Sequence, residues 1–218
     1  MLAAFEPAPF RRHAESRVEP LRAHVPLKVF SKDQEIFAEG DEADVFYKVV
    51  SGAVRTYKLL SDGRRQIDAF HLAGEIFGAE AGGEHRFTAE AVGEVSLIGY
   101  RRRSIDVLAF DDPDLAREVL SATMASLARA QEHMLLLGRK SAVEKIASFL
   151  LGLAERMTSG GAVDLPMARI DIADHLGLTI ETVSRTLTQL ERQGVISLPA
   201  NRRGVVLKDR AALRRLRA

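Results

Sequence analysis

Residues 169–193, RIDIADHLGLTIETVSRTLTQLERQ, predict two short helices joined by a tight turn. Gly177 stands where the first helix must end in a left-handed conformation, which glycine adopts at almost no cost. Thr179 is a favourable N-cap for the second helix, whose apolar residues recur at i, i+4 and i+7. The residues of this stripe, which we expect to face the domain interior, are Val183, Leu187 and Leu190. The spacing therefore indicates a helix-turn-helix.

The outer face of the second helix carries polar side chains suited to reading DNA. Glu181, Ser184 and Arg185 are spaced i, i+3 and i+4, so they project together near the helix N-terminus, where a recognition helix meets base edges. Arginine bonds guanine O6 and N7, glutamate accepts from cytosine N4, and serine contacts either base type. We expect DNA-backbone contacts from Arg169, Thr179, Thr182 and Thr188. The alternative is an ordinary amphipathic helix pair with a solvated outer face.

The segment that follows, QGVISLPANRRGVVLKD at 193–209, predicts a hairpin. Two short β-rich runs flank the turn signals Pro199-Ala200-Asn201 and Gly204. A hairpin directly after a recognition helix is typical of a wing, and Arg202 and Arg203 at its tip would meet phosphates. The alternative for these two arginines is a solvated turn.

Composition limits the classes of protein to be considered. Of the 218 residues, 46% are apolar and 28% charged, as in a soluble globular chain of one large or two modest domains. No run approaches the roughly 18 apolar residues of a membrane span, and the N-terminus lacks a secretory apolar segment. We therefore expect a cytoplasmic protein. The chain has no cysteine, which excludes disulfides, zinc ribbons and cysteine-ligated iron–sulfur clusters.

The net charge of +1 conceals an asymmetry. Residues 1–138 carry 17 Lys+Arg against 22 Asp+Glu, a net charge of −5. Residues 139–218 carry 14 against 8, a net charge of +6. A basic C-terminal third beside an acidic remainder is typical of a DNA-binding domain joined to a sensory one.

Residues 26–110 show a different pattern, after a proline-broken lead at 1–25. Runs such as VFYKVV, AVRTYKLL, QIDAFHL and VSLIGY are rich in β-branched and aromatic residues, with glycines between them. This pattern predicts an all-β jelly roll. The sequence SDGR at 61–64 predicts a hairpin turn. The sequence GEIFG at 74–78 resembles the edge of an anion pocket, because glycine lets backbone amides approach a ligand.

A cupin-like metal enzyme is the alternative for this β-unit. Such barrels hold a metal with clustered histidines, whereas His71 and His85 stand alone without an H-x-H pair. No nucleophile elbow, phosphate loop or H-E-x-x-H motif occurs in the sequence. We therefore expect no catalytic residues, no metal site and no cofactor.

Residues 111–138 predict a long helix that begins with Asp112 as N-cap and Pro113 in the first turn. From Ala116, residues recur at alternating steps of four and three, which is a heptad seam. The seam is formed by Leu120, Thr123, Leu127, Ala130, Met134 and Leu137. We expect it to pair with a second copy, because helix-turn-helix dimers read two half-sites. The alternative is that the stripe only packs against the β-unit.

The DNA-binding domain is expected to occupy residues 139–218. We predict a hinge at 138–141, an amphipathic helix over 142–157 and a loop at 158–161. A short strand is predicted over 164–167, because Pro166 disfavours a helix there.

This order of elements resembles the Crp/Fnr superfamily of bacterial transcription regulators over nearly the whole chain. The resemblance is carried by GDEADVFYKVVSGAVRTYKLLSDGRRQI, LAGEIFG, MLLLGRKSAVEKIASFLLGLAERM and ETVSR. It implies an α+β chain with a cyclic-nucleotide-binding-like β-roll, a dimerisation helix and a winged helix-turn-helix. The partners of the protein would be double-stranded DNA, a second copy of the chain and RNA polymerase. No membrane binding is expected.

Within the superfamily, E-x-x-S-R at 181–185 is similar to the Fnr pattern, which reads TTGAT–N4–ATCAA-like palindromes. The resemblance implies that Arg185 contacts guanine, Glu181 cytosine and Ser184 thymine. Candidate polymerase contacts lie in the 61–65 turn and the 158–164 loop, and are Asp62, Arg64, Ser159 and Asp164.

Departures from the superfamily point to its FixK-like branch. Cyclic-AMP binders have an Arg-Ser or Arg-Thr pair, whereas Arg86 is followed by Phe87, and Thr88 falls on the opposite strand face. Gly74, Glu75 and Arg86 would then be a vestigial pocket. Cluster cysteines are absent, so we expect an activator that needs no small ligand, for genes of low-oxygen respiration and nitrogen fixation. The alternative is a ligand-gated regulator of the same fold.

One further hypothesis concerns Ser184. The serine is either natural or stands in place of a cysteine, and a cysteine at this position would place a redox switch at the DNA interface. Restoring cysteine there and finding DNA binding unchanged by peroxide would reject the hypothesis.

Overall fold

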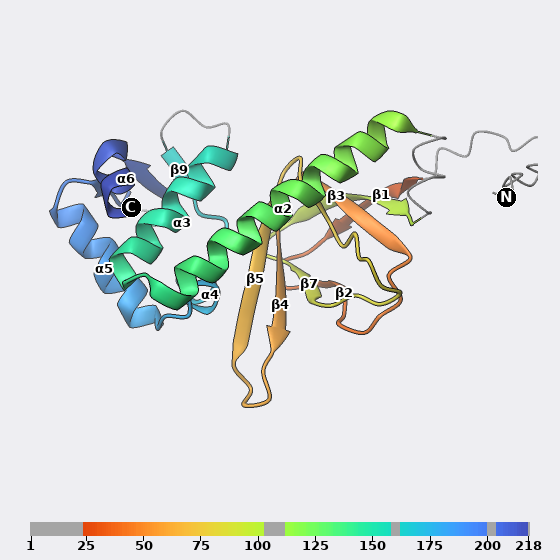
Figure 1. Ribbon diagram of the computed structural model, residues 1–218, viewed down its shortest axis with the longest axis horizontal. Helices are drawn as coiled ribbons and strands as arrows, with labels where there is room; N and C mark the ends of the chain where they lie inside the picture. Colours follow the sequence, from red (N-terminus) through yellow and green to blue (C-terminus); the bar gives the residue numbers. More distant parts are fainter. Residues whose placement is uncertain (1–23, 103–111, 158–161, 200–203, 218) are drawn as a thin grey trace, which may run out of the picture.

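A computed structural model describes residues 24–102, 112–157, 162–199 and 204–217. Figure 1 shows a β-roll at one end, a cluster of helices at the other, and the long helix α2 (Pro113–Arg139) running across both. Among the described residues, no helix is both long and apolar enough to cross a membrane.

The β-roll is a sandwich of two antiparallel sheets. One has the strand order β1-β8-β3-β6 and the other β2-β7-β4-β5. The strand bounds are His24–Phe30 (β1), Glu35–Phe37 (β2), Val45–Ser51 (β3), Ala53–Leu59 (β4), Arg65–Leu72 (β5), Ile76–Phe77 (β6), Thr88–Ala91 (β7) and Val95–Arg101 (β8). A buried aromatic and aliphatic core, including Phe30, Phe77 and Leu97, fills the sandwich.

Glycines set the corners between strands, as the sequence predicted. Gly52 has φ +82°, and a Cβ there would lie 2.3 Å from the carbonyl oxygen of Glu94, so the β3–β4 corner accepts only glycine. Gly63 has φ +82° in the predicted β4–β5 hairpin turn. The first strand begins at His24, two residues before the range that we predicted for the β-roll.

Helix α2 begins as predicted. The Asp112 side chain accepts from the Leu115 backbone N–H, and Pro113 lies at the first turn. Val119 packs against Phe46 and Ile76, so one side of α2 covers the sheet that contains β3 and β6. The expected hinge at 138–141 is shorter than predicted, because Gly138 and Arg139 are still helical and Ser141 already caps the next helix.

The C-terminal part is a winged helix-turn-helix. Its elements are α3 (Ala142–Arg156), β9 (Ala162–Asp164), α4 (Arg169–Leu176), α5 (Ile180–Arg192), β10 (Ile196–Ser197), β11 (Gly204–Leu207) and α6 (Arg210–Arg217). The strand predicted over 164–167 was misplaced. The strand ends at Asp164, where pairing with Gly204 of β11 fixes its register, and Pro166 lies beyond it.

Candidate DNA-reading site

The helix-turn-helix has the local geometry that its sequence predicted. Gly177 adopts the left-handed conformation with φ +60°, and the Leu178 N–H donates to the Ala173 carbonyl over 3.0 Å. The Thr179 hydroxyl caps α5 by accepting from the Thr182 N–H over 3.2 Å. The predicted stripe of Val183, Leu187 and Leu190 is buried. The opposite face of α5 is therefore the one presented to a partner.

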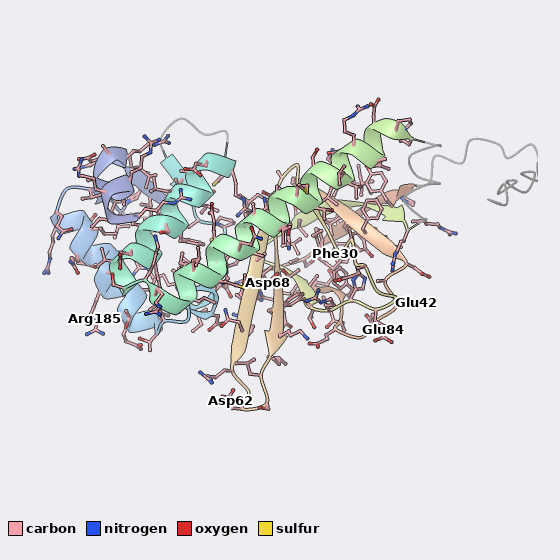
Figure 2. The ribbon with its side chains drawn as sticks, viewed as in Figure 1. Phe30, Glu42, Asp62, Asp68, Glu84 and Arg185 are labelled. Carbon is pink, nitrogen blue, oxygen red and sulfur yellow. The ribbon has the colours of Figure 1, made fainter. Side chains whose placement is uncertain are left out.

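Two of the predicted base-reading side chains are exposed on that outer face. Glu181 and Arg185 are both exposed, and Figure 2 shows Arg185 projecting from α5 away from the β-roll. The pKa of Glu181 is lowered by its own backbone N–H, next by the Thr179 hydroxyl, and further by the charge of Arg185. Glu181 is therefore ionised at neutral pH and can only accept hydrogen bonds.

Ser184 is half-buried and held by the first helix of the motif. Arg169 Nη1 donates to Ser184 Oγ over 3.1 Å, which leaves the serine proton available for an outside acceptor. Arg169, predicted to contact the DNA backbone, thus lies beside a predicted base contact. The residues are 15 apart in sequence, and no motif in the chain signals their pairing.

The threonines of α5 differ in what they offer. Thr179 and Thr182 lie at the N-terminus of α5, where their hydroxyls are 3.1 Å apart and the helix dipole favours a phosphate. The Thr188 hydroxyl donates to the Ser184 carbonyl over 3.0 Å, so it is turned back toward its own helix. Arg202 and Arg203 lie outside the described residues, although β10 and β11 form the antiparallel hairpin of the predicted wing.

The predicted vestigial pocket is not assembled as an anion site. Glu75 accepts from the Leu72 N–H over 3.0 Å and from Arg156 Nε and Nη2 over 2.8 and 2.6 Å. Burial, the largest single influence, raises the pKa of Glu75, but the hydrogen bonds and charge of Arg156, the Leu72 N–H and the charge of Arg129 together lower it. Arg86 is exposed above the Phe87 ring, and the Thr88 hydroxyl accepts from the Glu39 N–H over 3.0 Å.

A cavity of about 520 Å³ lies elsewhere, between β5, α2 and α3. Phe70, Leu136 and Phe149 contribute apolar surface to it, and Asp68 and Arg129 contribute polar groups. Gly74, Glu75 and Arg86 do not line it.

His71 and His85, the two histidines considered as metal ligands, are packing residues. His71 Nε2 lies 3.1 Å from the Thr56 hydroxyl, and burial lowers the pKa of His71 to about 3. The ring of His85 stacks on Phe37 with centroids 3.5 Å apart. Within the described ranges, no group of three or more His, Asp or Glu side chains is placed to hold a metal.

The predicted polymerase contacts come from separate parts of the molecule. Asp62 and Arg64 form an exposed ion pair of 2.7 Å at the tip of the β4–β5 hairpin (Figure 2). Asp164 lies in β9, far from that tip (Figure 1), and Ser159 lies outside the described residues.

The predicted seam forms an exposed apolar stripe on α2. Leu120, Leu127 and Met134 are 56%, 55% and 67% exposed, whereas Val119 and Leu136 on the other side are buried. The stripe continues over Thr123 and Ala130, which are exposed, to the half-buried Leu137. Ala116, which we placed at its start, is buried. Sequence reasoning missed Met124 and Leu135, two exposed residues that widen the stripe.

Comparison with known proteins agrees with this architecture. A model of the Crp-like helix-turn-helix domain matches residues 144–216, and a model of the cyclic nucleotide-binding domain matches residues 27–112. The nitrogen fixation regulation protein FixK of Azorhizobium caulinodans is 55% identical over 193 residues, covering 86% of this chain and 77% of that protein. The chain belongs to the Crp/Fnr family of transcription regulators.

Other members of the Crp/Fnr family support the assignment. FixK of Rhizobium meliloti is 48% identical over 85% of this chain and 84% of its own length. The structure of FixK2 from Bradyrhizobium japonicum superposes with a TM-score of 0.82 at 48% identity, covering 88% of this chain and 96% of that one. The relatives are regulators, so the prediction that this chain is not an enzyme is confirmed, and its helix-turn-helix is a DNA-binding element.

Proposed function

We propose that this regulator is a dimeric, sequence-specific activator that recognises a TTGAT–N4–ATCAA-like palindrome. The observation that carries the proposal is the N-terminal half of α5, where Glu181 and Arg185 are exposed and Ser184 lies between them. Because its FixK relatives are named as regulators of nitrogen fixation, we propose nitrogen-fixation genes as its targets. We also propose genes of low-oxygen respiration.

Each base contact has a chemical reason. The Arg185 guanidinium is exposed, with only a long contact of 3.5 Å from Nη2 to the Thr182 hydroxyl, and pairs with guanine O6 and N7. The ionised Glu181 carboxylate accepts from cytosine N4. The Ser184 hydroxyl, oriented by Arg169, donates to the O4 of thymine. Together the three side chains read neighbouring base pairs of one half-site.

The α2 stripe supports a dimer. Leu120, Leu127 and Met134 would each be removed from water by a second α2 in a coiled-coil pairing. Burying one such side chain fully is worth about 1.5–3 kcal/mol. A pair of α2 helices also carries two recognition helices, as a palindrome with half-sites one turn apart requires.

Independence from a small ligand is supported by the state of the vestigial pocket. Glu75 is occupied by Arg156, and the Thr88 hydroxyl is occupied by the Glu39 N–H. A cyclic nucleotide that used these two groups would need both of them released. The second candidate, a ligand-gated regulator, is favoured by the 520 Å³ cavity beside α2.

We further propose that RNA polymerase is contacted at the β4–β5 tip by Asp62 and Arg64, and near β9 by Ser159 and Asp164. Asp62, Arg64 and Asp164 are exposed. These contacts would convert DNA binding into activation.

Selection of bound sequences from a random duplex pool tests the proposal without presuming the site. The ligand-free protein should return an inverted repeat of TTGAT with a four-base-pair spacer. A control with Glu181→Ala and Arg185→Ala together should return no consensus. Recovery of a single half-site, or of no consensus by the unaltered protein, would contradict the proposal.

A further inference from the structure

A buried carboxylate joins the DNA-binding domain to the β-roll. Asp171, on α4, is 3% exposed. It accepts from Arg65 Nη2 over 2.6 Å, from Arg55 Nη1 over 3.4 Å and from the Ala168 backbone N–H over 3.2 Å. Arg55 lies on β4 and Arg65 on β5, whereas Asp171 lies in the first helix of the helix-turn-helix. One carboxylate therefore ties three elements together.

Further polar contacts extend this joint along α4. Asp174 accepts from Arg65 Nε over 2.9 Å. Gln66 Nε2 donates to the His175 carbonyl over 3.3 Å, and His175 Nδ1 lies 3.1 Å from the Ile67 carbonyl. Three successive residues of β5 thus bind one helix, and Figure 1 shows α4 beside β5.

The β-roll side of the joint is held in place by its own contacts. Arg55 is bound by Asp33 at 2.8 Å and by Glu90 at 3.0 Å, both residues of the β-roll. Its guanidinium plane therefore has a fixed direction. A buried ion pair adds little net stability, because desolvation offsets the attraction, but it selects one geometry of approach. These contacts are thus suited to setting the orientation of the DNA-binding domain relative to the β-roll.

The position of α4 in turn fixes that of α5. Ile172 and Leu176 of α4 are buried in the same core as Val183 and Leu187 of α5. The two helices therefore pack as one unit, and Asp171 is one of the contacts that hold this unit against β4 and β5.

We propose that Asp171, with Arg55 and Arg65, is a positioning residue that sets the distance between the two recognition helices. It would select the spacing of the half-sites and leave the choice of bases within each half-site to α5. The inference rests on the proposed dimer and palindrome.

The inference is tested by a distance measured in the absence of DNA. The chain has no cysteine, so Arg192→Cys places one spin label at the exposed end of each α5, and a dimer carries one labelled pair. Pulsed electron paramagnetic resonance should give one narrow distance distribution. The double variant Asp171→Asn with Asp174→Asn should broaden this distance distribution about twofold or more. The reason is that hydrogen bonds from Arg55 and Arg65 to a neutral amide hold the helix-turn-helix more weakly than those to a carboxylate.

The substitutions are chosen to keep the protein folded. Asparagine at 171 retains an oxygen for the Ala168 N–H, and the core of the helix-turn-helix is untouched. Glu39→Gln is the matched control, because Glu39 pairs with Lys58 of β4 at an exposed site of the β-roll that includes neither Arg55 nor Asp171. It should leave the distribution narrow. An unchanged distance distribution in the double variant would overturn the role of Asp171 but leave the proposed dimer standing. Absence of a dipolar signal in the protein that carries only the Arg192→Cys label site would overturn the proposed dimer as well.

Spacing selectivity gives the second measurement. Duplexes with N3, N4 and N5 spacers should be discriminated about tenfold, or about 1.4 kcal/mol, by the unaltered protein. The double variant should lose most of this preference while keeping its discrimination against a base change in the N4 half-site. Loss of base discrimination with spacing preference intact would contradict the inference.

Discussion

Arg169 of α4 holds the hydroxyl of Ser184 on α5 over 3.1 Å. Both helices of the motif therefore contribute to one base-reading surface. The scaffold helix orients a side chain of the recognition helix, and a change at Arg169 should be felt through Ser184.

A double-mutant cycle measures this coupling. Arg169→Ala and Ser184→Ala should each weaken binding to the palindrome, and their combined effect should be smaller than the sum by about 0.5–1.5 kcal/mol. Fluorescence anisotropy at fixed salt gives the four affinities. Arg169→Ala paired with Gln189→Ala, an exposed α5 residue without a contact to Arg169, serves as the additive control. Additivity in both cycles would mean that the hydrogen bond plays no part in DNA reading.

Arg185→Ala should cost about 1–3 kcal/mol on the palindrome and remove the preference for its base pair. The reason is that a bidentate arginine discriminates guanine from the other bases. Affinities for the four base pairs at the guanine position provide the measurement. An equal loss on every duplex would identify Arg185 as a phosphate contact instead.

Local signals predicted most of the DNA-binding motif, because each lies within a few residues. Gly177, Thr179 and the stripe at Val183 depend on neighbouring backbone, so sequence spacing is sufficient to find them. The contacts of Asp171 were missed because Arg55 lies 116 residues away in the sequence. In addition, an aspartate in a short helix looks like an ordinary solvent-facing charge. The prediction of an anion pocket at Gly74 was wrong for a related reason, because Arg156, which binds Glu75, comes from the distant helix α3.

Gly177→Ala should destabilise the protein by about 1–2 kcal/mol, because alanine is strained in the left-handed conformation. The added Cβ would make only an ordinary contact of 3.5 Å with Leu137, so the cost is conformational. Gly152→Ala in α3, with open space around its Cβ, should instead stabilise by about 0.5–1 kcal/mol. Urea unfolding of both variants measures whether the free energy of unfolding falls for Gly177→Ala and rises for Gly152→Ala. Equal changes would contradict the left-handed turn at Gly177.

Leu127→Glu should shift the dimer toward monomer, because it places a charge at the centre of the α2 stripe. Ser121→Glu introduces the same charge on α2 at an exposed position outside the stripe and should leave the dimer intact. Sedimentation equilibrium distinguishes the two. A dimer that survives Leu127→Glu unweakened would exclude the stripe as the interface.

Stability should fall between pH 7 and pH 5 by about 2 kcal/mol for each of two buried histidines. The pKa values of His71 and His175 are lowered from 6.5 to about 3, mainly by burial, and for His175 the charge of the nearby His133 contributes to this lowering. The unfolded chain therefore binds more protons below pH 6.5, and stability is lost as pH falls toward 3.

Urea unfolding at both pH values checks the histidine effect. His175→Phe keeps an aromatic ring at the joint and should reduce the pH-dependent loss by about 2 kcal/mol. A loss of unchanged size in this variant would show that His175 does not titrate as its burial requires.

The α2 seam illustrates what periodicity leaves open. Leu120 and Leu127 were placed on one helix face correctly, but the same pattern fits packing against the β-roll. In the folded chain this face is exposed whereas Val119 and Leu136 are buried, so the stripe does not pack against the β-roll, and its pairing with a second copy stays a prediction.

The affinity of the ligand-free protein for a TTGAT–N4–ATCAA duplex decides whether it recognises this palindrome without an effector. Fluorescence anisotropy against a scrambled duplex, at one stated salt concentration, should show a preference of about a thousandfold or more. Addition of cyclic AMP should leave both affinities unchanged. Selective binding that appears only after cyclic AMP is added would make the protein a ligand-gated regulator, and no selectivity under either condition would reject the proposed palindrome.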